Sequence, residues 1–298
     1  MALENCTLCR GTGWKMVPRQ DGAGGRVAVA CDCGMEERAS RVMERARIPK
    51  RYEHCDFESY VTDLADGKFY SSQHAESLKR AKLFAQSFVR DYPGSDQAGL
   101  LFMGNSGVGK THLAIAAMKQ AIKTTGVRAK YYDTRGLLTQ IRSTYNSLTK
   151  TAEMDIIRPV MEADLLILDD LGAERLTDWV EETMNVIVNS RYNAKLPTIF
   201  TSNYEDVPDR EEMNSLLVRV GFRLHSRLRE MCEFLEYDGP DYRNLPPNAG
   251  AEDLYNLWKA QPRRKLPVKA GGQARAQLRA PKSTEKVDLK WTGGRAGS

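Results

Sequence analysis

Short apolar runs alternate along this chain with longer segments in which apolar residues recur at helical spacing. The short runs predict five strands, at residues 99–103, 128–132, 164–170, 198–203 and 232–237. The longer segments predict helices at residues 35–47, 72–90, 112–121, 134–148, 156–162, 177–194 and 216–231, and a further short helix at 252–260. Because strands that alternate with helices are typical of α/β domains, we expect a parallel five-stranded sheet flanked by helices.

The length of 298 residues suits one large α/β domain with an appendage, or two modest domains. The pattern predicts an N-terminal module with a helix (1–47), a linker (48–71), a main domain (72–246) and a mostly disordered tail (247–298). No run of 18 apolar residues occurs, and residues 1–14 lack the apolar core of a signal peptide. We therefore expect a cytoplasmic protein with reduced thiols and no membrane contact.

The net charge of +5 is unevenly distributed along the chain. Residues 263–298 contain ten Lys or Arg and two acidic residues, so this segment carries +8 and residues 1–262 carry −3. The segment is also poor in apolar residues, which predicts disorder. A basic tail of this kind predicts a contribution to DNA binding that weakens as salt rises.

The stretch between the first predicted strand and the next helix matches G-x-x-x-x-G-K-[ST] at every fixed position. Glycines let successive backbone N–H groups turn toward a phosphate, and the helix N-terminus adds partial positive charge. Lys110 is expected to reach the β- and γ-phosphates of ATP, and the Thr111 hydroxyl to ligate Mg²⁺. The predicted nucleotide-binding residues are Gly104, Asn105, Ser106, Gly107, Val108, Gly109, Lys110, Thr111 and His112.

The third predicted strand ends in two carboxylates, Asp169 and Asp170. At the carboxyl end of a strand beside the phosphate loop, Asp169 is expected to hold Mg²⁺. Asp170 is placed to polarise the attacking water, and Glu174, one methylene longer, is the alternative for that role. Asn203 at the tip of the fourth strand is a candidate for orienting the water or contacting the γ-phosphate; the alternative is a loop cap.

Four cysteines near the N-terminus occur in two close pairs, Cys6 with Cys9 and Cys31 with Cys33. In a reduced compartment such pairs favour tetrahedral zinc over disulfides. Four protein ligands leave no open position, so the predicted site is structural; unbound cysteines and another metal are the alternatives. His54, beside the isolated Cys55, is a possible substitute ligand.

Together these motifs resemble the AAA+ helicase loaders of the DnaC/DnaI type and the related IstB transposition helpers. The resemblance spans about residues 48–245 and rests on residues 48–60, 104–111, 165–174, 201–203, 221–229 and 241–243. The phosphate loop and the acid pair alone indicate only a P-loop NTPase. The connector at 48–60 and the arginine-rich helix narrow the resemblance to these loaders.

The resemblance implies roles for three further side chains. Asn203 corresponds to sensor 1, Arg243 to sensor 2, and Arg227 to an arginine finger that reaches the ATP of a neighbouring subunit. An arginine supplied in trans contributes ~10³ to 10⁵ in rate for phosphoryl transfer. The alternative for Arg227 is a solvated basic helix face. The helix at 134–148 corresponds to the family's initiator-type insertion, and the little chain left after Arg243 implies a minimal lid and a slow, switch-like ATPase.

The function that the resemblance implies is ATP-dependent loading of a hexameric replicative helicase of the DnaB type onto single-stranded DNA. The ATPase would work at an intersubunit site in an ATP-dependent oligomer, and the zinc module would contact the helicase. One alternative is an IstB-like transposition helper that coats duplex DNA. Another is a nucleic-acid-binding adaptor whose ATP site is structural.

Overall fold

The computed structural model describes residues 5–19, 24–62, 73–92, 94, 99–144, 151–207, 214–239, 241–244 and 256. All of them fall within residues 1–264, the first of two units into which the chain divides. The tail at 263–298 lies outside the described residues, and so does the predicted helix at 252–260 apart from Asn256.

Five parallel strands form the central sheet, in the order β4-β5-β6-β3-β7. They are β3 (Gly99–Met103), β4 (Ala129–Asp133), β5 (Leu165–Asp169), β6 (Thr198–Ser202) and β7 (Cys232–Glu236). Met103 pairs with Ser202 and Glu236, and Asp133 pairs with Asp169, so the carboxyl ends of the strands align at one end of the sheet. The predicted five-stranded parallel sheet is confirmed.

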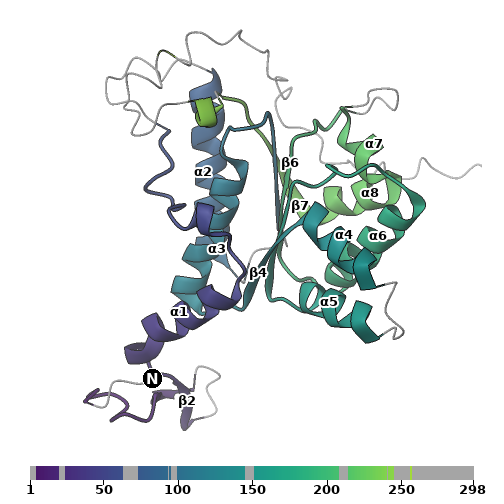
Figure 1. The fold of residues 1–298 in the computed structure, drawn as a ribbon. Coiled ribbons are helices and arrows are strands. Elements are labelled where there is room, and N and C mark those ends of the chain that lie inside the picture. Colours follow the sequence, from purple (N-terminus) through teal and green to yellow (C-terminus); the bar gives the residue numbers. More distant parts are fainter. Residues whose placement is uncertain are drawn as a thin grey trace, which may run out of the picture. The chain divides into compact units, whose positions relative to one another are not determined.

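Helices cover both faces of this sheet (Figure 1). On one face lie α1 (Met35–Arg45), α2 (Gln73–Asp91) and α3 (Lys110–Thr125), and on the other α4 (Thr134–Ser143), α5 (Thr151–Met161), α6 (Asp178–Asn193) and α8 (Phe222–Met231). Because successive strand side chains point to opposite faces, Leu100 and Phe102 join the core with α2 and α3. Leu101 and Met103 join the core with α6 and α8. No described helix has the combined length and apolar character needed to cross a bilayer.

The arginine-rich helix predicted at 216–231 is two helices in the structure. A short helix, α7 (Leu216–Val220), ends at Gly221, and α8 begins at Phe222. Gly221 has φ of 83° and ψ of 156°, which interrupts the helical backbone and favours a residue without Cβ. The helix predicted at 35–47 also ends earlier, at Arg45 with Ala46 as its C-cap, so the segment before Pro49 is not helical.

The N-terminal module contains an antiparallel hairpin that the sequence analysis did not predict. Its strands are β1 (Trp14–Pro18) and β2 (Arg26–Ala30), with Lys15 opposite Val29. A 3₁₀ turn, η1 (Asp32–Gly34), leads from β2 into α1. Trp14 and Met16 are more than half exposed, so the hairpin does not bury its own apolar side chains.

The end of α1 is attached to β4, an edge strand of the central sheet. The backbone N–H of Tyr131 donates to the carbonyl oxygen of Ala46 at 2.8 Å. The Nζ atom of Lys130 donates to the carbonyl oxygen of Arg45 at 2.6 Å. Two neighbouring residues of the strand therefore hold the last turn of the helix.

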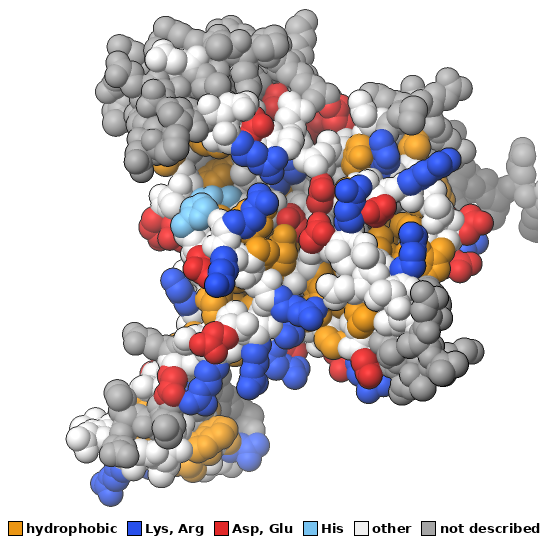
Figure 2. All heavy atoms as spheres, in the orientation of Figure 1, with side chains coloured by type: hydrophobic (Ala, Val, Ile, Leu, Met, Phe, Trp, Pro, Cys, Tyr) orange, Lys and Arg blue, Asp and Glu red, His pale blue; other side chains and the backbone are white. Residues whose placement is uncertain are grey.

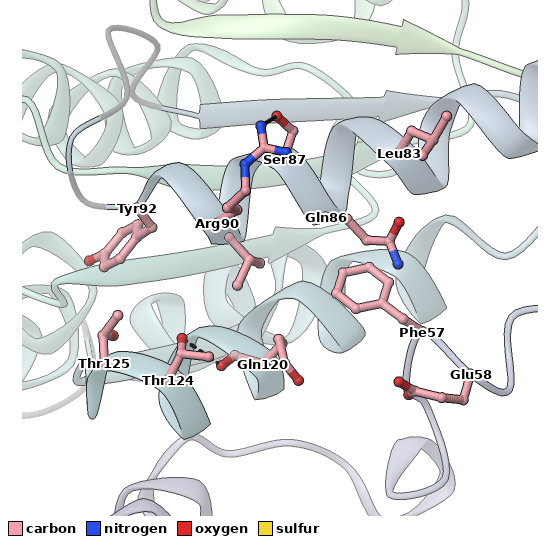
Figure 3. Close-up of a pocket in the computed structure, with 11 residues that line it drawn as sticks. Phe57, Glu58, Leu83, Gln86, Ser87, Arg90, Tyr92, Gln120, Thr124 and Thr125 are labelled. Atoms are coloured by element: carbon pink, nitrogen blue, oxygen red, sulfur yellow. Dashed lines mark hydrogen bonds between the residues drawn. The ribbon is translucent and has the colours of Figure 1, made fainter.

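The connector after α1 includes a second 3₁₀ turn, η2 (Lys50–Tyr52), and packs against α3. Lys119 of α3 donates to the carbonyl oxygens of Glu53 and Cys55. Phe57 reaches a groove of about 570 Å³ that also has residues of α2 and α3 in its walls (Figure 3). Because Phe57 is 7% exposed, it anchors the connector in the core beside these helices.

Arg191 of α6 is fully buried at the amino end of the sheet. Its guanidinium donates to Thr198 Oγ1 at 2.9 Å and to the carbonyl oxygens of Val160 at 3.0 Å, Ala163 at 2.7 Å and Pro197 at 2.8 Å. Burial lowers the pKa of Arg191 to about 10, which leaves it charged at neutral pH. One side chain therefore joins the end of α5 to the starts of β5 and β6.

Candidate nucleotide-binding site

The predicted phosphate loop connects the end of β3 to the start of α3. Gly107 and Gly109 have φ of 83° and 92°, in the left-handed region that glycine adopts without strain. A Cβ at Gly107 would overlap Asp241, and one at Gly109 would lie 2.6 Å from Cε2 of Tyr60. Glycine is thus required both by the backbone turn and by the segments packed behind it.

Lys110 closes the loop on itself. Its Nζ donates to the carbonyl oxygens of Gly104 at 2.9 Å and of Asn105 at 2.7 Å. Burial lowers the pKa of Lys110 to about 8, although Asp170 and Asp169 oppose this shift. A buried cation held mainly by neutral carbonyls is suited to exchange those partners for an anion.

Asp169 lies at the end of β5 and accepts three hydroxyl hydrogen bonds. Thr111 Oγ1 and Thr201 Oγ1 donate to Oδ1 at 2.8 and 2.6 Å, and the Tyr131 hydroxyl donates to Oδ2 at 2.7 Å. Burial raises the pKa of Tyr131, followed in effect by the nearby Asp169, so its hydroxyl remains a donor. The pairing of Thr111 with Asp169 fits the residues predicted to hold Mg²⁺. The roles of Tyr131 and Thr201 were not predicted.

Asp170 has φ of 58°, a strained conformation for a residue with a side chain. Asn203 Nδ2 donates to Asp170 Oδ1 at 2.6 Å, so the proposed water-side acid and sensor 1 are in direct contact. Burial, and then the negative charge of Asp169, raises the pKa of Asp170. The alternative acid, Glu174, is paired with Arg135 at 2.7 Å and does not line the pocket.

The segment after β7 packs across the phosphate loop. Asn105 Nδ2 donates to Asp238 Oδ1 at 2.8 Å. Farther along, the Tyr242 N–H donates to the carbonyl oxygen of Gly107 at 3.2 Å, and Arg243 donates to Ser106 Oγ at 3.2 Å. Arg243 is therefore beside the loop, as its sensor 2 correspondence implies, and the backing by Asp238 was not predicted.

Arg227 is the predicted site residue that the structure does not bring to the pocket of its own chain. Its Nε atom donates to Asn189 Oδ1 at 3.0 Å, and its Nη1 atom donates to the carbonyl oxygen of Arg223 at 3.2 Å. The side chain is thus held on the surface between α6 and α8. A residue that acts on a neighbouring subunit has no need to reach this pocket.

A cavity of about 590 Å³ joins these groups. Predicted residues among its walls are Ser106, Gly107, Gly109, Lys110, Thr111, His112, Asp169, Asp170, Asn203 and Arg243. Gly104 and Asn105 contribute through the carbonyls that hold Lys110, and Val108 is buried beneath the loop, where its carbonyl accepts from the Tyr60 hydroxyl at 3.2 Å. The connector supplies part of the opposite wall through Pro49, Arg51 and Tyr52. On the face in Figure 2, acidic and basic side chains lie close together.

The four N-terminal cysteines converge as their spacing predicted. The sulfur atoms of Cys6 and Cys31 are 3.7 Å apart, those of Cys9 and Cys33 are 3.3 Å apart, and all four lie within 4.8 Å of one another. Backbone N–H groups of Cys9 and then Leu8 lower the pKa of Cys6 to about 6. A cluster of four thiols, one of them with a lowered pKa, fits a tetrahedral zinc ion. His54 is not among these residues.

Comparison with known proteins agrees with this geometry. A family model described as IstB-like ATP binding protein matches residues 34–243. The replicative helicase loader DnaC of Escherichia coli (strain K12) is 26% identical over 189 residues, which cover 63% of this chain and 69% of that protein. A crystal structure of the DnaC helicase loader matches with a TM-score of 0.53 and 32% identity, over 63% of this chain and 99% of that one.

A further relative, the uncharacterized protein YqaM of Bacillus subtilis (strain 168), is 26% identical over 218 residues. The match covers 70% of this chain and 63% of YqaM, so the chain spans less than two thirds of that relative's length. These likenesses confirm the predicted P-loop fold of the AAA+ type and the resemblance to DnaC.

Proposed function

The chain belongs to the IstB-like ATP-binding protein family, and on that premise we propose that it loads a replicative DNA helicase onto single-stranded DNA under the control of ATP. The observation that carries the proposal is the similarity, over 189 residues, to a relative named as a replicative helicase loader. The proposed partners are a hexameric helicase of the DnaB type, single-stranded DNA and further copies of this chain.

The residues of the pocket support ATP binding and hydrolysis. Bound ATP would supply the phosphoanhydride bond that breaks, and Mg²⁺ would supply positive charge that stabilises the phosphate oxygens as it breaks. Lys110 exchanges its carbonyl partners for phosphate oxygens, and Thr111 with Asp169 holds the cation. Asp170, oriented by Asn203, accepts a hydrogen bond from the attacking water and raises its nucleophilicity.

Slow, switch-like turnover is part of this proposal. Lys110 must leave the carbonyl oxygens that hold it before it can contact a phosphate, which supports a slow first step. We assign Arg227 to the active site of a neighbouring copy, where its charge would complete the pocket. ATP binding then promotes assembly, and hydrolysis releases it.

Mixing two inactive variants tests the intersubunit site. Lys110→Ala removes the phosphate contact and Arg227→Ala removes the finger, so each alone should lack turnover. A mixture contains interfaces with an intact loop and an intact finger, and we expect it to recover part of the wild-type rate. Arg223→Ala, an exposed position on the same helix, is the control and should keep its turnover. A mixture as inactive as its components would contradict the trans assignment.

Helicase loading itself is tested by unwinding of forked DNA with a DnaB-type helicase. The protein should accelerate unwinding, Lys110→Ala should not, and Lys123→Ala, an exposed position on α3, should behave as wild type. Loss of helicase binding in Cys6→Ser with Cys9→Ser would support a zinc module that contacts the helicase. An unchanged unwinding rate with wild-type protein would contradict the loader proposal.

The family description also keeps an IstB-like transposition helper as a second candidate. That function predicts ATP-dependent coating of duplex DNA and stimulation of a transposase. An adaptor with a structural ATP site is the third candidate, and measured ATP turnover that Asp169→Ala leaves unchanged would favour it over both.

A further inference from the structure

We propose that the protein holds a divalent transition metal ion of the zinc class at a second site, formed by His54, Cys55 and His112. One ring nitrogen of each histidine and the Sγ atom of Cys55 lie within 4.8 Å of one another. The three residues come from two places in the sequence, the connector and the first turn of α3. The site is separate from the four-cysteine cluster, which shares no residue with it.

The donor set determines the class of ion. Imidazole nitrogen and thiolate sulfur bind borderline-soft ions such as Zn²⁺ and Co²⁺, whereas Mg²⁺ and Ca²⁺ require oxygen ligands. Three protein ligands leave one position of a tetrahedral ion open. All three side chains line the nucleotide pocket, so that position faces a space accessible to water or a small ligand.

The site is reached from solvent without opening the core. Cys55 is 1% exposed, but His112 is only partly buried and His54 is exposed. Histidine side chains also appear at the surface in Figure 2, beside Lys and Arg side chains. The buried sulfur of Cys55 would thus hold the ion from the protein side, and the exposed imidazole of His54 would lie on the side from which the ion enters.

The surroundings of His112 suit a metal-binding histidine. Its Nε2 atom lies 2.8 Å from the carbonyl oxygen of Asp56, and because a carbonyl only accepts, that nitrogen carries the proton. The lone pair is then on Nδ1, and donation to a carbonyl is the contact that orients most metal-bound histidines. Burial lowers the pKa of His112, which keeps the ring neutral at physiological pH.

The thiol must lose its proton when the ion binds. Burial raises the pKa of Cys55 to about 11, so the free thiol is protonated at neutral pH. On binding, the S–H bond breaks, a bond between sulfur and metal forms, and the proton leaves to the buffer. Binding at this site is therefore accompanied by proton release.

The alternative is that Cys55 is a small buried side chain near two histidines by chance. It does belong to the core beneath the connector, together with Phe57 and Tyr60. That alternative predicts no ion at saturating metal, and it predicts no spectroscopic signature of a bond between sulfur and metal. The two possibilities are separated by counting ions.

The test measures Zn²⁺ bound per full-length chain at saturating free Zn²⁺, for wild type, His54→Ala and His225→Ala. His54 is exposed, so its replacement leaves the fold intact, and His225 is a matched control because it pairs with Asp206 elsewhere. We expect His54→Ala to bind one ion fewer than wild type and His225→Ala to bind the same number. Equal numbers for wild type and His54→Ala would overturn the proposal.

A second measurement isolates the site. The quadruple variant with Cys6→Ser, Cys9→Ser, Cys31→Ser and Cys33→Ser should bind one Co²⁺ with a charge-transfer band of the intensity of a single thiolate. Adding Cys55→Ser should abolish that band, while Cys232→Ser, at the other isolated buried cysteine, should not. A band that survives Cys55→Ser, or no band in the quadruple variant, would also overturn the assignment.

Discussion

A buried polar network lies at each end of the central sheet. The two networks differ in whether they leave hydrogen-bonding capacity for a ligand. At the amino end, Arg191 donates to a hydroxyl and several backbone carbonyls that belong to fixed parts of the fold. At the carboxyl end, Asp169 accepts from three hydroxyls, although a carboxylate offers about four lone-pair sites. The first network is closed by the backbone, and the second keeps capacity for a ligand.

The hydrogen-bond partners of Arg191 and of Asp169 also differ in how easily they can move. Backbone carbonyls cannot move without moving the helix end or the strand starts to which they belong, so the Arg191 network makes the fold rigid. Hydroxyls rotate, so Thr111, Thr201 and Tyr131 can reorient when a cation arrives at Asp169. We expect mutations at the amino end to change stability and mutations at the carboxyl end to change chemistry.

The largest expected effect is at Arg191. Arg191→Met leaves several buried carbonyl oxygens without a donor, each at a cost of ~1–3 kcal/mol, so the free energy of unfolding should fall by about 3–5 kcal/mol. Urea unfolding measures this change, with Arg158→Met, an exposed position on α5, as control. A loss no larger than that of the control would show that the two ends of the sheet do not differ as described.

Asp169→Asn should have the next largest effect, and on turnover instead of stability. The amide keeps the shape of the side chain but removes the charge that holds Mg²⁺, so ATP turnover should fall by ~10² to 10³. Asp164→Asn, at the other end of β5, should retain nearly full turnover. If Asp169→Asn and Asp164→Asn lowered turnover equally, the loss would come from a general disturbance of β5 and not from the removal of a Mg²⁺ ligand.

Tyr131→Phe sharpens the comparison within one strand. The Tyr131 hydroxyl orients the carboxylate of Asp169, and losing such a contact should raise the Mg²⁺ concentration for half-maximal turnover by about tenfold. Tyr132→Phe is the matched control, since Tyr132 lies on the opposite face, where its ring contacts Arg47. Equal Mg²⁺ dependence in the two variants would remove Tyr131 from the site.

The smallest effect is on the pH dependence of stability without nucleotide. The pKa of Lys110 is about 8 in the folded chain, below the 10.5 of an exposed lysine, so the unfolded chain binds more protons between these values. Stability should therefore rise with pH there, by about 1 kcal/mol between pH 8 and pH 9. Lys110→Met should lack this rise in stability with pH. An identical pH dependence of stability in both proteins would contradict a lowered pKa for Lys110.

Residues that act through local sequence were predictable. The phosphate loop and Asp169 follow from a motif, a strand end and a helix start, all read within a few positions. Tyr131 was missed because it reaches Asp169 only through the pairing of β4 with β5, and Asp238 because it reaches Asn105 only where the chain returns after β7. No local sequence pattern encodes either contact. Arg191 was missed because a charged residue on a helix is expected at the surface unless its partners are known.

The interruption between α7 and α8 was also not predicted, because local periodicity does not reveal it. Gly221 sits inside a segment whose apolar spacing is helical on both sides, so periodicity favoured one helix. The backbone conformation at that glycine interrupts it, and α8 then begins as a separate element that carries Arg227. The N-terminal hairpin was not predicted because the alternating side chains of β1 remain partly or fully exposed, so no buried apolar face marks the strand.

The contact between the end of α1 and β4 has a consequence for self-association. An edge strand offers unpaired N–H and C=O groups to any other chain, and here the N–H of Tyr131 is already bonded to Ala46. Lys130, the neighbouring residue on the strand, adds a charge that opposes sheet extension. Copies of this protein are therefore discouraged from joining sheet to sheet along β4, and the proposed ATP-dependent oligomer would form through surfaces other than this edge, where association can be reversed.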